Sequence, residues 1–121
     1  MPDVELDEQI WRGLEYLEVV SGPGAIAEMV GAFEADAPAR IARMAAALEA
    51  EAWSSLSGLA HDLKSNSASV GLGQLSSRAA EIERIARDGA SPLLAPLLAA
   101  ARELLPPSLR AIQDRARNYP A

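Results

Sequence analysis

Residues 26–48 read IAEMVGAFEADAPARIARMAAAL, and this stretch decides the fold class. Its apolar residues recur every three or four positions, the spacing of one face of an α-helix: Ile26, Met29, Val30, Phe33, Ala37, Ile41, Met44 and Leu48. The register continues through Pro38. A proline inside a helix removes one hydrogen bond and crowds the preceding turn, so the pattern predicts one long helix kinked near Pro38. Two helices joined by a tight turn are the alternative.

Similar apolar stripes predict further helices on both sides of this stretch. Leu6, Ile10, Leu14 and Leu17 mark a short first helix, which residues 21–24 (SGPG) break. Later stripes cover residues 56–70, 75–86 and 94–105, and a final one continues over 109–116. Gly71 is predicted as a left-handed cap, Ser91 and Pro92 as a helix start, and Pro106 and Pro107 as a break or bend.

These stripes predict an all-α fold, an antiparallel four-helix bundle with an additional short N-terminal helix. The chain has 121 residues, which suits a single domain over 1–121. Hydrophobic residues make up 50% of it and aromatic residues only 4%, so Ala, Leu, Ile, Val and Met must build the core. Ala and Leu are strong helix formers, which supports the same fold class.

The charge and the termini bear on partners and location. A formal net charge of -6 argues against nucleic acid and against an anionic membrane surface as partners. Without Cys, disulfides and thiolate metal sites are excluded. The first residues lack the pattern of a signal peptide, and no apolar run reaches the ~20 residues that span a bilayer. We therefore expect a cytoplasmic protein.

The single histidine, His61, stands on an unusual helix face. Its neighbours one or two turns away are all small except Lys64: Ser57, Gly58, Ser65 and Ala68. His61 is also out of phase with the apolar stripe of its own helix. These features predict an exposed imidazole that another protein can approach closely. A histidine with only a structural role is the alternative.

The residues around His61 limit its chemistry. A metal site needs several converging ligands, and neither a second His, a Cys nor a carboxylate shares this stripe. Ser57 or Ser65 could act with His61 as nucleophile and base, but no acid on this face orients the ring. A Walker-type phosphate loop is also absent. What remains is attack of the imidazole on phosphorus, with Lys64 offsetting the charge of the phosphoryl oxygens.

Two further features are interpreted as structural. Trp11 and Trp53 lie near helix starts, which favours packing over ligand stacking. Glu83 and Arg87 have i,i+4 spacing and are interpreted as a solvated surface ion pair.

The run of residues 60–71, AHDLKSNSASVG, resembles the signature of the histidine-containing phosphotransfer (HPt) domains of two-component phosphorelays. Agreement falls on five positions: His61, Leu63, Lys64, Ser67 and Gly71. The resemblance covers a core region of about residues 26–87, and the two ends of the chain match only as generic bundle helices.

The resemblance implies a phosphoryl carrier rather than an enzyme. His61 would accept a phosphoryl group from a receiver-domain aspartate and pass it to another receiver aspartate, and Lys64 would stabilise the group. The partners would be response-regulator receiver domains or a hybrid histidine kinase. The carrier would be a monomer without a cofactor of its own, because the divalent metal belongs to the receiver. Part of the docking surface would be formed by Ser57, Gly58, Ser65 and Ala68.

One position departs from the family pattern. Ser65 stands where these domains usually have glycine, one turn after the phosphorylated residue. Because serine is still small, we expect an altered rate or partner preference rather than a loss of function.

Two other functions stay open at this level. In the dimerisation and phosphoacceptor domain of a sensor histidine kinase, a phosphorylated His is also followed by an acidic residue, as in His61-Asp62. In that class of domain a proline commonly stands where this chain has Asn66, and an ATP-binding domain follows the phosphorylated helix. Both features count against this alternative. Oligomeric state separates the two, since that domain is an obligate dimer. The other alternative is a receiver-binding module that is not phosphorylated.

Overall fold

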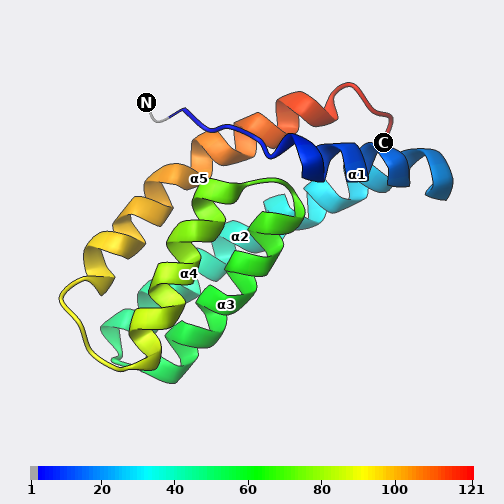
Figure 1. Ribbon diagram of the computed structural model, residues 1–121. Helices are drawn as coiled ribbons and strands as arrows, with labels where there is room; N and C mark the ends of the chain where they lie inside the picture. The colour runs from blue at the N-terminus through cyan, green and yellow to red at the C-terminus, as the bar shows by residue number, and fades with distance from the viewer. Residues whose placement is uncertain (1–2) are drawn as a thin grey trace.

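The computed structural model describes residues 3–121, and all regular elements in this part of the chain are α-helices (Figure 1). The helices are α1 (Glu8–Ser21), α2 (Ala25–Glu49), α3 (Trp53–Ser69), α4 (Gly73–Arg87) and α5 (Leu94–Ala116). The all-α prediction is confirmed for these residues. The predicted continuity through Pro38 is also confirmed, because α2 is one helix with Pro38 in its interior.

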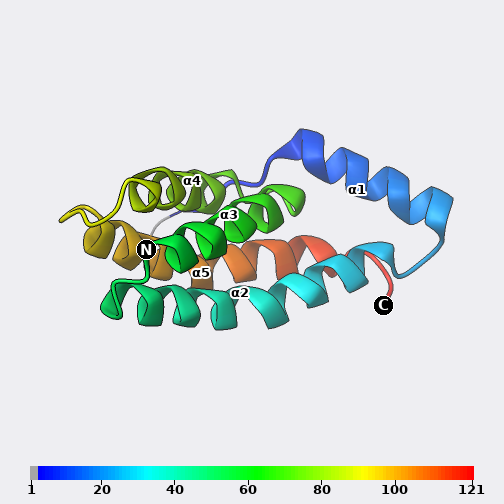
Figure 2. The same cartoon turned by 90° about the horizontal axis from the view of Figure 1, so that it is seen from below.

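The helices α2 to α5 pack around a common interior. α3 contacts α2 and α4, and α5 contacts the same two helices from the opposite side. Figure 2 shows α3 and α4 in one layer and α2 and α5 in the other. α1 packs on α2 and extends beyond the ends of α3 and α4 in this view. Within residues 3–121, no helix combines the length and the apolar character needed to cross a membrane.

The start of α5 differs from the prediction. The helix begins at Leu94, and Pro92 lies in the turn before it rather than at the first helical position. Ser91 still caps this turn, because its hydroxyl accepts the Leu93 N–H at 3.2 Å and its carbonyl accepts the Leu94 N–H at 3.3 Å. Pro106 and Pro107 lie inside α5 without breaking it.

All five helices contribute to the core. The largest fully buried apolar side chains are Trp11, Ile26, Met44, Leu56, Leu63, Leu72, Leu75, Ile82, Leu94 and Ile112. Trp11 is completely buried, so its predicted packing role is confirmed. Its indole N–H donates to the Val70 carbonyl at 3.0 Å, which ties α1 to the C-terminal end of α3.

The connection between α3 and α4 spans only residues 70–72. The Gly71 N–H donates to the Ala68 carbonyl at 3.1 Å, and the Leu72 N–H donates to the Ser67 carbonyl at 2.9 Å. This pair of bonds closes the helix end in a Schellman motif. The motif needs a left-handed backbone conformation at the residue just after the helix end. Gly71 supplies it with φ +76°, as the sequence predicted. Its carbonyl also accepts the Asp7 N–H at 2.9 Å, so α1 is bound to this turn at a second point.

Gly71→Ala is expected to lower the free energy of unfolding by about 2 kcal/mol. A Cβ here would lie 2.8 Å from Trp11 Cδ1 in addition to the strained positive φ. Urea denaturation of the two proteins measures the difference. Gly13→Ala is the matched control, because Gly13 is an exposed helical residue with open space at the Cβ position. It should stabilise the protein by up to about 1 kcal/mol. Equal effects of the two substitutions would contradict the role assigned to Gly71.

Candidate functional site

His61 projects from the middle of α3, and its side chain is 55% exposed. The inward face of the helix is occupied by other residues, namely Leu56, Ala60, Leu63 and Ser67. The predicted exposure of the imidazole is therefore confirmed.

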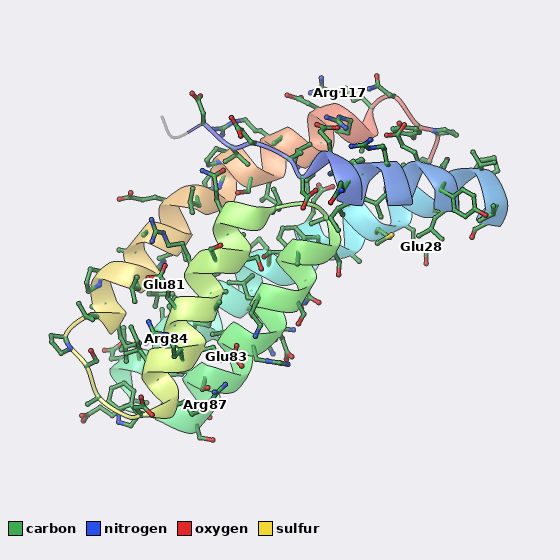
Figure 3. All side chains as sticks on the ribbon, viewed as in Figure 1. Glu28, Glu81, Glu83, Arg84, Arg87 and Arg117 are labelled. Atoms are coloured by element: carbon green, nitrogen blue, oxygen red, sulfur yellow. The ribbon has the colours of Figure 1, made fainter. Side chains whose placement is uncertain are left out.

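A carboxylate from the neighbouring helix holds this imidazole. Glu83 on α4 places Oε2 2.8 Å from His61 Nδ1, and its Oε1 accepts a hydrogen bond from Lys64 Nζ at 2.6 Å. The Glu83 side chain is only 9% exposed. Figure 3 shows Glu83 on the side of α4 that faces α3. His61 and Lys64, one turn apart on α3, thus share one buried carboxylate.

Two hydroxyl groups fix α3 against α4 around this carboxylate. Ser57 Oγ donates to the Glu83 carbonyl at 3.1 Å, and Ser76 Oγ donates to the Lys64 carbonyl at 2.9 Å. Each bond joins one helix to the main chain of the other. The relative position of His61 and Glu83 therefore depends on backbone contacts as well as on their own hydrogen bond.

The interpretation of Glu83 as half of a solvated surface pair was wrong. Arg87 Nη2 does lie 3.1 Å from Glu83 Oε2, and the Arg87 side chain is 65% exposed, but the carboxylate itself is buried. The expectation was that no acid on the His61 face of its own helix orients the ring, and it missed Glu83, which orients the ring from α4. The reason is that spacing along α3 does not reveal a side chain from another helix. The available signal was the position of Glu83 between Ala79, Ile82 and Ala86, inside the apolar stripe of α4.

The charges around Glu83 keep it ionised. The Lys64 ammonium holds the pKa of the Glu83 carboxyl below its ordinary value, and the hydrogen bond to His61 acts in the same direction. Burial opposes both effects because it disfavours the charged form. The attraction to the neighbouring donors prevails.

An ionised Glu83 determines which ring nitrogen of His61 carries the proton. A carboxylate only accepts hydrogen bonds, so Nδ1 must be the donor in the neutral imidazole. The lone pair then lies on Nε2, at the other end of the ring. A half-exposed imidazole with a fixed tautomer is suited to act as a nucleophile through Nε2.

The other predicted site residues fall into two groups. Gly58, Ser65 and Ala68 are exposed, as expected for a docking surface. Ser57 is half-buried, and its hydroxyl is engaged with α4. An open groove lies between the first half of α3 and the end of α4, bordered by residues that include Ser57, Gly58, His61, Glu83 and Arg87.

A second polar cluster lies on the α2 side of His61. Arg40, with its side chain 14% exposed, makes two hydrogen bonds to Asp36 at 2.9 and 3.1 Å and one to Asp62 at 3.1 Å. The Arg40 guanidinium holds the pKa of the Asp36 carboxyl below its ordinary value. Asp62, the residue after His61, is thereby drawn toward α2 and away from Glu83. Among residues 3–121, no three His, Cys, Asp or Glu side chains gather where they could hold a metal ion.

The comparison with known families assigns most of this chain to one family. The family model of the Hpt domain matches residues 28–117, which include α3, α4, His61 and Glu83. The chain belongs to the Hpt domain family. No curated protein and no solved structure gives a significant match.

Hpt domains are phosphocarrier modules of two-component signalling systems, and they interact with receiver domains. The whole of α1 lies outside the matched residues, although it is fastened to the α3–α4 turn. In this Hpt domain the match thus covers α3, α4, α5 and all but the first three residues of α2.

Glu83→Ala is expected to shift the neutral His61 ring from the Nδ1–H form toward the Nε2–H form. Loss of the carboxylate removes the acceptor that holds the proton on Nδ1. The ¹⁵N chemical shifts of the ring nitrogens, measured at alkaline pH where the ring is neutral, report the two populations. Glu81→Ala is the matched control, because Glu81 lies on the same helix and pairs with Arg78. A ring with unchanged shifts in Glu83→Ala would show that the carboxylate does not set the tautomer.

The unfolding free energy of the wild type should depend more steeply on acid pH than that of Glu83→Gln. Because the folded-state pKa of Glu83 lies below its ordinary value of 4.5, the unfolded state takes up a proton first as the pH falls. The contribution of Glu83 is fully present above about pH 4.5 and disappears as the pH falls through the folded-state value. Urea denaturation at a series of pH values measures it. Parallel curves for the two proteins would contradict the assigned ionisation.

Proposed function

We propose that this Hpt domain is a phosphorelay intermediate that receives a phosphoryl group from a receiver-domain aspartate on His61 and passes it to the aspartate of another receiver. The observation that carries the proposal is the exposed imidazole whose Nδ1 is held by the buried Glu83 carboxylate. Membership of the family supports a phosphotransfer role. We assign the reaction to Nε2, because Nδ1 is engaged by Glu83.

The accepting step follows from the ring tautomer. His61 Nε2 attacks the phosphorus of the aspartyl phosphate in line with the bond that breaks. The Nε2–P bond forms while the P–O bond to the aspartate breaks, and the aspartate leaves as a carboxylate. The imidazole, still protonated on Nδ1, becomes positively charged. Glu83 lies 2.8 Å from that nitrogen and stabilises the charge as it develops.

The donating step is the reverse of this reaction with a second receiver. Its aspartate oxygen attacks the phosphorus, the P–Nε2 bond breaks, and the ring returns to its neutral form with Nδ1 protonated. No proton has to leave or enter the site in either direction, because Glu83 keeps the same proton on Nδ1 throughout. This property suits a carrier that is loaded and unloaded by similar partners.

Lys64 is assigned to the phosphoryl oxygens in this scheme. Its ammonium lies one turn from His61 and is 35% exposed, so it can turn toward a group on Nε2. Ser57, Gly58, Ser65 and Ala68 are assigned to the docking surface. Within that set, the exposed Gly58, Ser65 and Ala68 leave room for the partner, whereas Ser57 supports the surface through its bond to α4.

Residues 1–121 act as a single monomeric domain in the cytoplasm, with α2 to α5 as an antiparallel four-helix bundle and α1 as an addition to it. The divalent metal needed for aspartate chemistry is brought by the receiver or by a hybrid histidine kinase that contains one. The Hpt domain is then a substrate of its partners rather than a catalyst.

Incubation with a phosphorylated receiver should transfer label to this chain in an acid-labile, alkali-stable form, as expected for phosphohistidine. His61→Gln should take up no label, because it lacks the nucleophile. The assay follows radiolabelled phosphate on the separated proteins. Wild type without label would favour the receiver-binding module that is not phosphorylated, and label on His61→Gln would assign the chemistry to another residue.

The same assay examines the unusual serine beside the site. Ser65→Gly should still be labelled, at a rate or with a receiver preference different from the wild type. Rates that do not differ with any receiver would show that Ser65 has no influence on transfer.

A further inference from the structure

Arg87 is the last residue of α4 and contacts the same carboxylate oxygen as the reactive histidine. Its Nη2 lies 3.1 Å from Glu83 Oε2, and His61 Nδ1 lies 2.8 Å from that oxygen. Arg87 also borders the open groove that His61 and Gly58 border. In Figure 3 it lies one turn beyond Glu83, toward the end of α4. A guanidinium group is therefore held beside the imidazole on the side opposite to the Asp62–Arg40 pair.

Among the charged groups in direct contact with one another at Glu83, positive charge exceeds negative charge in the unphosphorylated state. Glu83 carries one negative charge, whereas Lys64 and Arg87 each bring one positive charge to it. A phosphoryl group adds a charge of about −1.5 to −2 at neutral pH. The two cations thus exceed the carboxylate before phosphorylation, and a phosphoryl group on His61 supplies the negative charge that is lacking.

Arg87 is also built to move. Its side chain is 65% exposed and holds Glu83 by a single hydrogen bond, while Lys64, at 2.6 Å and 35% exposed, is held more firmly. Release of Arg87 leaves Glu83 with Lys64 and His61, so the buried carboxylate stays paired. Because the guanidinium end of this pair is 65% exposed and Glu83 keeps two other donors, the exchange of partners costs little free energy.

We propose that Arg87 is a second phosphoryl-binding cation, which leaves Glu83 when His61 is phosphorylated and hydrogen-bonds the phosphoryl oxygens on Nε2. The assignment rests on the proposed role of His61 as the acceptor. A guanidinium fork can engage two oxygens at once, which a lysine ammonium does less well. Lys64 approaches the phosphoryl group from α3 and Arg87 approaches it from α4. Together they enclose the group between the two helices.

The test phosphorylates His61 without any receiver. Phosphoramidate donates its phosphoryl group directly: the Nε2–P bond forms, the P–N bond of the reagent breaks, and ammonia leaves. After removal of the reagent, ³¹P NMR follows hydrolysis, in which water replaces the imidazole on phosphorus and inorganic phosphate is released. A cation on the phosphoryl oxygens holds the charged group in place, so its loss shortens the half-life.

Arg87→Gln should shorten the half-life of phosphohistidine about threefold relative to the wild type. Arg84→Gln is the matched control, since Arg84 is an exposed arginine one turn earlier on the same helix (Figure 3) and is not among the residues that border the groove. It removes the same charge and should leave the half-life unchanged. Thermal unfolding checks that both variants remain folded, as expected for exposed side chains.

Three results would overturn the inference. One is an equal half-life for Arg87→Gln and the wild type, and another is an equal shortening by Arg84→Gln, which would indicate a general charge effect. The third is a wild type that phosphoramidate does not phosphorylate on His61. Because no receiver takes part, the first two results leave the relay proposal standing, and failure of transfer from a receiver leaves this measurement unaffected.

Discussion

A carboxylate that remains charged between two packed helices must be surrounded by donors and opposite charges, because burial without them is costly. Glu83 satisfies this condition with Lys64 and His61, both supplied by α3. This requirement has two consequences. It secures the pairing of α3 with α4, and it fixes the orientation and the tautomer of the only histidine. The candidate chemistry at Nε2 is a consequence of how Glu83 is accommodated.

The alignment of α3 with α4 is supported from outside the site. The three-residue turn around Gly71 sets where α4 begins, and Trp11 and Asp7 bind the carbonyls of this turn. α5 holds Trp11 in place from the other side, since Arg115 lies 5.4 Å above its ring and pairs with Glu8. α1 therefore stabilises the turn that positions His61 over Glu83, although all of it lies outside the residues that the family model matches.

The sequence was sufficient for the fold class and for the position of His61, because both depend on periodicity within one helix. The stripe through Pro38 and the left-handed Gly71 were predicted on that basis and confirmed. Glu83 was missed because its partners lie on another helix, and i,i+4 spacing to Arg87 offered a simpler explanation. Pairing between helices depends on their rotation and register, which a single amphipathic pattern leaves undetermined. The start of α5 was misplaced for a local reason, since a capped turn precedes the helix.

Under the proposed relay, Glu83 has two opposing effects on the stability of the phosphorylated carrier. It stabilises the positively charged ring that forms when Nε2 is phosphorylated, and it competes with the phosphoryl group for Lys64 and Arg87. A carrier without this competition would bind the phosphoryl group through both cations and release it slowly. A carrier without the carboxylate would lack a fixed tautomer and would be loaded slowly. A buried acid that shares its cations with the phosphoryl group therefore keeps the energies of the loaded and unloaded forms close, which is the condition for transfer in both directions.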